Sequence, residues 1–298
     1  MIKELTVATS TALLTIALLT WFYPVSADFQ PNNDGWNGLA QLVSKQGSIQ
    51  GPLELLATLN PKKYTLFIIG PSLPFKPQEV NSVRGFLAKG GRVVLADDFG
   101  SANQLLEELR VPLRIEGGIV RDPLLNIGAP ELPVAYWSRK RIALNYASAL
   151  NTSLCSDCQV LAYSSIFSYL DKNLNGQYDA GEPVGPLPIV VSIKLLGGEL
   201  VVISDSSVFI NSMLTKESNA ELLAFLLGQT VPAIDNTHWE PDTLSSIKAA
   251  LYSLYTVVSS YELRYVFAAS IPLLLIIYKR RETFKKRLKT MSNDTLQA

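Results

Sequence analysis

The sequence predicts an α/β protein: a parallel sheet with helices on both faces, plus a C-terminal transmembrane helix. Three observations carry this prediction. Short, wholly apolar runs typical of buried parallel strands alternate with segments of helical periodicity. The stretches between them are rich in glycine, proline, asparagine and aspartate, which form turns. Near the C-terminus, an apolar run of membrane-spanning length precedes a cluster of basic residues.

Two strand–helix units open the predicted sheet. Tyr64–Ile69 and Arg92–Ala96 are the buried strands, and apolar residues recur at helical spacing in Pro77–Lys89. A second helix covers Ser101–Leu109, whose first residue and Gln104 have the spacing of a capping box. Because strands and helices alternate, right-handed crossovers and parallel pairing are expected.

Weaker signals complete the predicted domain, which covers residues 28–235. The pattern loosens over residues 121–156, so we expect an irregular insertion with strand pieces there. Gly197-Gly198 lies between two apolar runs and indicates a hairpin. The other expected elements are short helices at 39–45 and 51–60, short strands at 113–115, 119–120 and 160–163, hairpin strands at 189–195 and 199–204, and a helix at 218–227.

The N-terminal segment, residues 1–27, has the pattern of a signal peptide. An apolar run over Leu5–Tyr23 ends in Pro24-Val25-Ser26-Ala27, with small residues where signal peptidase requires them. We expect cleavage after Ala27. The alternative is an uncleaved signal anchor, because the run is long.

The C-terminal segment predicts the topology. Residues 236–260 read as a helical stalk and residues 261–278 as a transmembrane helix. Residues 279–298 carry seven Lys/Arg against two acids, a net charge of +5, which marks a cytoplasmic tail. The alternative, a buried core helix, rarely ends in such a cluster. The protein is therefore expected in the cell membrane, with the bulk of the chain extracytoplasmic.

Residues 171–182 match a twelve-residue calcium loop. Oxygen ligands recur at the spacing that the loop requires, and Gly176 occupies the sharp turn. Prolines follow the loop, so no exiting helix forms and a structural Ca²⁺ is expected rather than a switch. The alternative is a solvated turn without metal. The predicted ligands are Asp171, Asn173, Asn175, Gln177 through its carbonyl, Asp179 and Glu182.

The two cysteines, Cys155 and Cys158, form one Cys-x-x-Cys in a polar loop. Zinc would need two further ligands, and the only histidine, His238, lies 80 residues away beside the predicted stalk. A disulfide in an oxidising compartment and two idle thiols both remain open. Asn151 begins a glycosylation sequon, which suits the same extracytoplasmic side.

Acidic residues follow two of the predicted strands. Asp97 and Asp98 come after Arg92–Ala96, and Asp205 follows the second hairpin strand. Ligands of parallel sheets bind at these carboxyl ends, so the three are candidates for binding or general-base chemistry. The alternative, which we favour, is that Asp98 caps the next helix while Asp97 binds backbone amides of a nearby loop.

Several stretches resemble a known fold. Residues 68–72 (Ile-Ile-Gly-Pro-Ser), 89–100 and 197–205, with 33–39 and 206–214, are similar to the class I glutamine-amidotransferase-like fold. The version resembled belongs to an uncharacterised archaeal membrane-anchored family, a domain of unknown function. Similar domains occur in auxiliary parts of gliding-type ABC transporters and in intraflagellar transport proteins. The resemblance implies a flavodoxin-like sheet, and genes of this kind often neighbour MoxR-type ATPases and transglutaminase-like proteins.

The residues of this chain depart from amidotransferase chemistry. Neither cysteine follows a buried strand, and no Gly-x-Ser-x-Gly elbow is present. No basic stripe with interleaved aromatics supports nucleic-acid binding. We therefore expect a non-enzymatic ectodomain that binds a partner protein or surface glycan. The alternatives are a cell-surface hydrolase using Asp97, Asp98 or Asp205, and a subunit of a membrane complex with an ATPase partner.

Overall fold

A computed structural model describes residues 27–45 and 47–240, together with a few single positions nearer the two ends. The chain divides into two compact units, Pro24–Pro241 and a second made of Met1–Tyr23 with Asp242–Ala298. The predicted signal segment, stalk, membrane span and basic tail fall almost wholly outside the described residues. Within the described positions, no helix is both long and apolar enough to cross a membrane.

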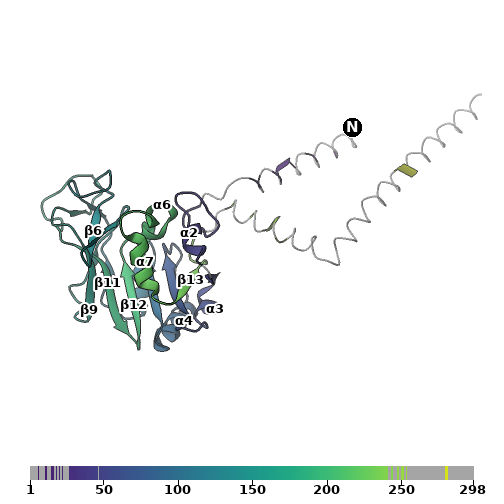
Figure 1. The fold of residues 1–298 in the computed structure, drawn as a ribbon, viewed down its shortest axis with the longest axis horizontal. Helices are drawn as coiled ribbons and strands as arrows, with labels where there is room; N and C mark the ends of the chain where they lie inside the picture. The colour runs from purple at the N-terminus through teal and green to yellow at the C-terminus, as the bar shows by residue number, and fades with distance from the viewer. Residues whose placement is uncertain are drawn as a thin grey trace, which may run out of the picture. The chain divides into compact units, whose positions relative to one another are not determined.

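The first of these units is built on a nine-stranded mixed sheet (Figure 1). One half is parallel, because β1, β13, β2, β3 and β12 all run in the same direction. From β12 onward every neighbour is antiparallel. The spatial order is β1 (Ile49–Gly51), β13 (Val231–Asp235), β2 (Tyr64–Ile69), β3 (Arg92–Ala96), β12 (Gly198–Ile203), β11 (Pro188–Leu195), β9 (Cys158–Ser164), β6 (Val134–Trp137) and β7 (Lys140–Ala143).

The antiparallel half corrects the prediction of a parallel sheet. The predicted hairpin exists, with Leu196 and Gly197 at positive φ between β11 and β12. The segment expected to be an irregular insertion with strand pieces supplies β6 and β7, which join the main sheet. Their turn places Ser138 and Arg139 at positive φ, where glycine, asparagine and aspartate are usual. The sequence therefore lacked the signal by which this hairpin is normally found.

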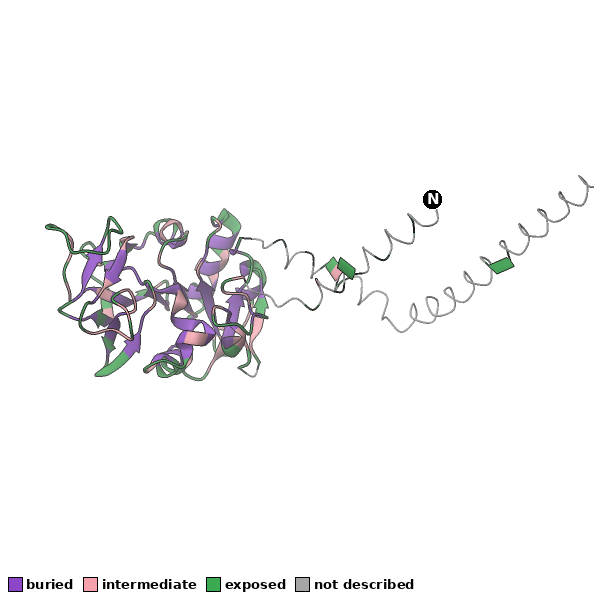
Figure 2. Ribbon diagram, turned by 90° about the horizontal axis from the view of Figure 1, so that it is seen from above, coloured by how far each residue is buried: buried purple, intermediate pink, exposed green. Residues whose placement is uncertain are grey.

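Helices cover both faces of the sheet, as predicted. In β2, Phe67 and Ile69 pack on one face, whereas Leu66 and Ile68 pack on the other. Figure 2 shows these buried layers beneath exposed loops. The first face holds α2 (Ala40–Val43), η1 (Ser206–Phe209), α6 (Asn211–Leu214) and α7 (Asn219–Leu227), and the second holds α3 (Leu53–Leu56), α4 (Pro77–Ala88) and α5 (Ala102–Glu108).

Two small antiparallel sheets lie outside the main one. They bring the segments after α5 against the segments before β9 and β11. The first pairs β4 (Arg114–Ile115) with β8 (Leu150–Asn151), and the second pairs β5 (Ile119–Arg121) with β10 (Tyr169–Asp171). The second sheet therefore leads straight into the predicted calcium loop.

The segment after β13 is anchored by a buried histidine. His238 lies between two carboxylates, with Nδ1 at 2.6 Å from Asp235 and Nε2 at 3.4 Å from Glu79. Phe75 stacks on its ring at 4.3 Å. Although burial alone would lower it, the pKa of His238 is raised because both carboxylates favour the imidazolium. This residue belongs to the domain core, and the nearby Thr237 hydroxyl, 3.4 Å from Nδ1, donates to Asp235.

We predict that the domain loses stability as pH rises through the raised pKa of His238. A raised pKa contributes stability that is fully present below the unfolded value of about 6.5 and disappears above the folded value. Lys76 Nζ also lies 3.6 Å from Glu79. His238→Gln should therefore cost about 1–3 kcal/mol at pH 6 and less at pH 9, measured by denaturant unfolding. An equal loss at both pH values would contradict this account.

Candidate functional site

The parallel pairing brings the predicted strand-end acids to one edge of the sheet. Ala96, the last residue of β3, pairs with Ile69 of β2 and with Ile203 of β12. The loops continue this contact, since Gly70 N–H donates to Ala96 O at 2.8 Å and Asp97 N–H donates to Ile203 O at 3.0 Å. The aspartates that follow β3 and β12 are therefore neighbours, which the sequence alone did not show.

Asp97 is a structural cap. Its carboxylate is buried and accepts hydrogen bonds from the N–H groups of Asp98, Gly100 and Ala102, each at 2.9 Å. Ala102 is the first residue of α5, so this side chain holds the junction between β3 and α5. Burial raises the pKa of Asp97, and the three N–H donors oppose that effect.

These contacts correct two expectations about the β3–α5 junction. We expected Asp98 to cap the helix, but Asp97 does so. The expected capping box is also absent, because Ser101 makes no side-chain cap hydrogen bond. Gln104 instead accepts the N–H of Phe75 at 2.8 Å. The spacing predicts that Gln104 caps the start of α5, but its side chain instead binds the loop before α4.

Asp205 is a second structural cap. It is fully buried, and its carboxylate accepts the N–H of Ser207 and the N–H of Asn145, each at 2.8 Å. The first of these bonds begins η1. Burial raises the pKa of Asp205 well above its usual range, and the charge of nearby Asp98 adds to the shift. This carboxyl group is therefore held in the interior by the backbone around it.

Asp98 differs from the other two acids because it is only partly buried. Ser206 Oγ donates to Asp98 Oδ1 at 3.0 Å and is its side-chain donor among the described residues. Burial raises the pKa of Asp98 to about 6; the bond from Ser206 opposes the shift and the charge of Asp97 adds to it. A carboxylate has about four lone-pair positions, so acceptor capacity remains at this group.

Asp98 lines a cavity of about 240 Å³ at the carboxyl edge of the sheet. Glu116 contributes a second partly exposed carboxylate to the wall. Lys172 Nζ lies 2.7 Å from Glu116, and the Asn151 amide donates to the same carboxylate at 2.6 Å. The hydrogen bond from Lys172 is the main cause of a lowered pKa at Glu116. The lining residues are Asp97, Asp98, Phe99, Gly100, Asn103, Ile115, Glu116 and Gly117.

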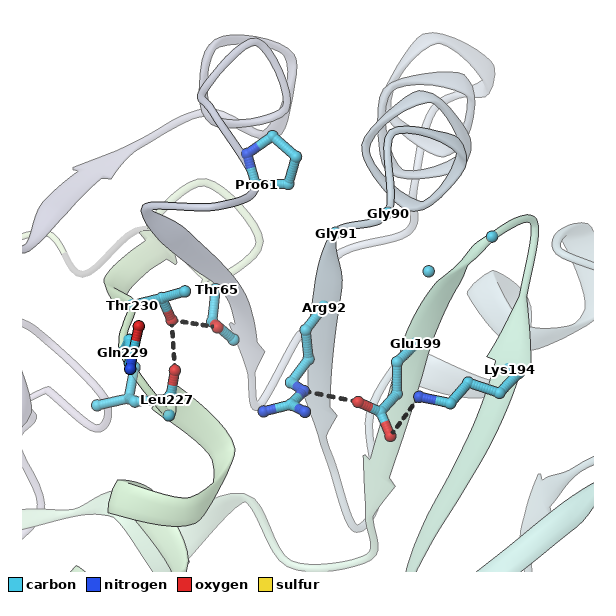
Figure 3. A pocket seen from close by; sticks show the side chains of 13 residues that line it. Pro61, Thr65, Gly90, Gly91, Arg92, Lys194, Glu199, Leu227, Gln229 and Thr230 are labelled. Carbon is cyan, nitrogen blue, oxygen red and sulfur yellow. Dashed lines mark hydrogen bonds and ion pairs between the residues drawn. The ribbon is translucent and has the colours of Figure 1, made fainter.

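A larger cavity of about 520 Å³ lies at the amino ends of β3 and β12 (Figure 3). Its charged groups are paired, two cations with one carboxylate: Arg92 Nε is 2.8 Å from Glu199, and Lys194 Nζ is 3.3 Å from the same carboxylate. Arg92 also donates to the carbonyl of Leu226 at 2.7 Å, which caps the end of α7. We favour the smaller cavity as the functional site, because ligands of parallel sheets bind at carboxyl ends and its acids have perturbed pKa values.

The predicted calcium loop is closed by its own hydrogen bonds. Asp171 is fully buried and accepts the N–H groups of Asn175 at 3.1 Å and Gly176 at 2.9 Å. Arg121 Nε also lies 2.8 Å from the Asp171 carboxylate. Although burial opposes it, the pKa of Asp171 is lowered by the Gly176 N–H and by Arg121. No local sequence pattern predicts this ion pair, because Arg121 and Asp171 belong to different strands, β5 and β10.

The other predicted calcium ligands surround the same turn. Asp179 accepts the side-chain amides of Asn173 and Asn175, each at 2.7 Å. Glu182 accepts the N–H of Lys172 at 2.8 Å and that of Asp179 at 3.0 Å. No group of three or more His, Cys, Asp or Glu side chains among the described residues is arranged to hold a metal. The donor set nevertheless consists of oxygen atoms alone, which is the chemistry that Ca²⁺ requires.

The other two predicted sites are the cysteine pair and the sequon residue, of which Asn151 contacts the wall of the small cavity. A disulfide joins Cys155 and Cys158, whose Cα atoms are 5.4 Å apart. Asn151 is exposed, and its side-chain oxygen accepts the N–H of Ser153 at 3.0 Å while its amide donates to Glu116. Glu116 and Phe99 were missed as site residues, because single acids and aromatics carry no motif. Only the fold places them beside Asp98.

The comparisons with known proteins give a family but no activity. A family model described as "Domain of unknown function (DUF4350)" matches residues 28–227. No curated protein matches the chain.

Solved structures share only weak similarity. The mmIFT52 N-terminal domain is 16% identical with a TM-score of 0.41, over 54% of this chain and 76% of that one. The β-galactosidase from Bacillus circulans sp. alkalophilus is 13% identical with a TM-score of 0.35, over 56% of this chain and 22% of that enzyme. Gan42B, a GH42 β-galactosidase, is 10% identical with a TM-score of 0.33, over 69% of this chain and 28% of that enzyme. The chain thus spans only about a quarter of either enzyme.

We predict opposite effects from removing the two adjacent aspartates. Asp97→Ala should cost about 0.5–2 kcal/mol at pH 5, because the amides of the β3–α5 junction lose their acceptor. It should still destabilise at pH 8, but by less, because the pKa of Asp97 is also raised. Asp98→Asn should match the unchanged chain at pH 5 and exceed its stability at pH 8. A raised carboxyl pKa gives stability that is lost as pH rises through about 6, and asparagine avoids that loss.

Denaturant unfolding of the full chain at both pH values measures these effects. A destabilising Asp98→Asn at pH 8, or a neutral Asp97→Ala, would show that the two roles have been assigned the wrong way round.

Proposed function

Because the chain belongs to the DUF4350 family, whose function is unknown, we propose its role from the site itself. The protein is a non-catalytic binding or scaffold domain with an amidotransferase-like fold. A C-terminal transmembrane helix tethers it outside the cytoplasm, and Ca²⁺ stabilises its loop at residues 171–182. The binding face is the cavity at the carboxyl edge of the sheet, and its ligand is a protein partner.

The proposal rests on which of the three strand-end acids are already engaged in hydrogen bonds to the backbone. General acid–base chemistry at this edge needs at least two converging, accessible ionisable groups. Asp97 and Asp205 are buried and already accept backbone N–H groups. Asp98 is then the one acid of the three that reaches the cavity with acceptor capacity to spare. Glu116, the other partly exposed carboxylate in the wall, is bound by Lys172 and Asn151. This supports recognition through Asp98 rather than hydrolysis by a pair of carboxylates.

Three sequence features support the proposed location. The apolar segment at 261–278 and the basic tail at 279–298 have the order typical of a span with a cytoplasmic end. Both lie outside the described residues. The disulfide between Cys155 and Cys158 suits an oxidising compartment, as does the exposed sequon at Asn151. The simplest role for the basic tail is to fix this topology and contact anionic lipid.

The geometry of residues 171–182 supports a structural Ca²⁺. The first ligand, Asp171, is fixed by the N–H of Gly176, which bends the loop around its carboxylate. The last ligand, Glu182, is tied to the N–H of Lys172 at the start of the loop. Side chains of Asn173 and Asp179 complete an all-oxygen donor set between these ends. When bound, the cation would neutralise the negative charge that these carboxylates concentrate in one turn.

We predict that a calcium chelator lowers the melting temperature of the full chain. At a free Ca²⁺ concentration about one hundred times the dissociation constant, binding adds about 2.7 kcal/mol to stability. Glu182→Gln should remove the chelator effect, because a charged ligand is lost. Gln177→Ala is the matched control and should keep it, since this residue offers only its backbone carbonyl. Identical melting curves with and without chelator would reject the stabilising role.

We predict that a partner can be captured from the cavity rim but not from the opposite edge of the sheet. Phe99 and Leu196 have similar exposure, 55% and 52%, and lie at the carboxyl and amino edges respectively. A photoreactive benzoylphenylalanine in place of Phe99 should give a discrete protein adduct in native membranes. The same substitution at Leu196 is the control and should not give that adduct. No adduct at position 99, or the same adducts at both positions, would contradict the proposed binding face.

A further inference from the structure

We infer that the cavity beside Asp98 receives the cationic side chain of a lysine or arginine from a protein partner. This inference rests on the proposed function and names the chemistry that the binding face recognises. It is carried by the unused hydrogen-bonding capacity of the cavity wall, by its charge, and by its size and exposed aromatic rim.

The wall of the cavity has few hydrogen-bond donors left to offer. The N–H groups of Asp98 and Gly100 both donate to Asp97. The side chain of Asn103 is engaged at both ends with Ile115, donating to its carbonyl and accepting its N–H, each at 2.9 Å. Asp98, by contrast, keeps acceptor capacity beyond its bond with Ser206. A complementary ligand must therefore donate hydrogen bonds.

The charges around the cavity favour a cation. Asp98 and Glu116 line the wall, and no lysine or arginine is among the lining residues. Lys172 offsets Glu116 from outside, with 47% of its side chain exposed. Asp98 is then the principal charge that faces the cavity. An ammonium or guanidinium group placed against Asp98 would form a charge-assisted hydrogen bond, which is stronger than a neutral one.

The size and rim of the cavity fit one side chain. Its volume of about 240 Å³ lies below the range of about 300–1,000 Å³ that is usual for small-molecule pockets. Phe99 is 55% exposed at the rim, where its ring can cover the methylene stem of a lysine or arginine or contact the cation itself. Gly117 has open space where a side chain would project, so a ligand can approach the backbone there.

The test measures binding of fluorescent peptides to the full chain by anisotropy. The probes are acetyl-Gly-Lys-Gly-amide, its arginine counterpart and a neutral glutamine counterpart, each carrying the same dye. We expect the lysine or the arginine peptide to bind at least about tenfold more tightly than the glutamine peptide at pH 7.5, a difference of about 1.4 kcal/mol. Comparison of the two cationic peptides shows which side chain is preferred.

Three variants locate the interaction. Asp98→Asn should reduce the affinity for the cationic peptide about tenfold, and Phe99→Ala should also weaken it. Asp157→Asn removes an exposed acid from the disulfide loop and should leave the affinity unchanged. Between pH 5 and pH 7.5 the affinity should rise as Asp98 ionises, because its pKa is about 6. The Asp98→Asn chain should not show this rise.

Equal binding of the glutamine peptide, or equal effects of Asp98→Asn and Asp157→Asn, would overturn the cationic ligand. The photocrosslinking result at position 99 separates this failure from failure of the proposed function. If a partner is crosslinked at position 99 although the chain does not bind cationic peptides, the proposed binding role stands. Only the cationic ligand is then rejected.

Discussion

The carboxylate of Asp97 determines the character of the strand-end face. It binds three backbone N–H groups between Asp98 and Ala102, across the junction of β3 and α5. Asp205 binds the N–H of Ser207, which follows β12, and that of Asn145, which follows β7. Because these buried acids organise the backbone, the edge of the sheet is rigid and most of its donors are already used. Asp98 is left at the surface of a preformed cavity, and its raised pKa follows from the burial that this arrangement imposes.

The remaining walls of the cavity come from segments outside the parallel half of the sheet. The loop between β4 and β5 carries Glu116, and Lys172 of the predicted calcium loop is paired with it. Asn151, the sequon residue, donates to the same carboxylate. Under the proposed function, the calcium loop and any glycan at Asn151 would therefore lie next to the binding face. Arg121 links this region to the fully buried Asp171 and so ties the loop to the β5–β10 pair.

Local patterns in the sequence were sufficient to predict the parallel half of the sheet. The apolar runs of β2 and β3 and the helical repeat of α4 predict their elements, and the strand-end rule selects Asp97, Asp98 and Asp205 as candidates without showing that they meet. The β11–β12 hairpin was also predicted, from Gly197-Gly198. The β6–β7 hairpin escaped prediction because it turns through Ser138 and Arg139, which are atypical there. The roles of the acids also escaped it, since which carboxylate caps α5 depends on loop geometry.

The central claim is that Asp98, of the three strand-end acids, keeps acceptor capacity at the cavity, while Glu116 in the same wall is bound by Lys172 and Asn151. Carbon-13 NMR of aspartate carboxyl groups in the full chain tests this directly, by comparing titrations of the unchanged chain and of Asp98→Asn. The account predicts that the carboxyl group of Asp98 titrates near pH 6 in the unchanged chain and that this titration is missing from the variant. Identical titration curves in the two chains would contradict it, because Asp98 would then not be the group that titrates near pH 6.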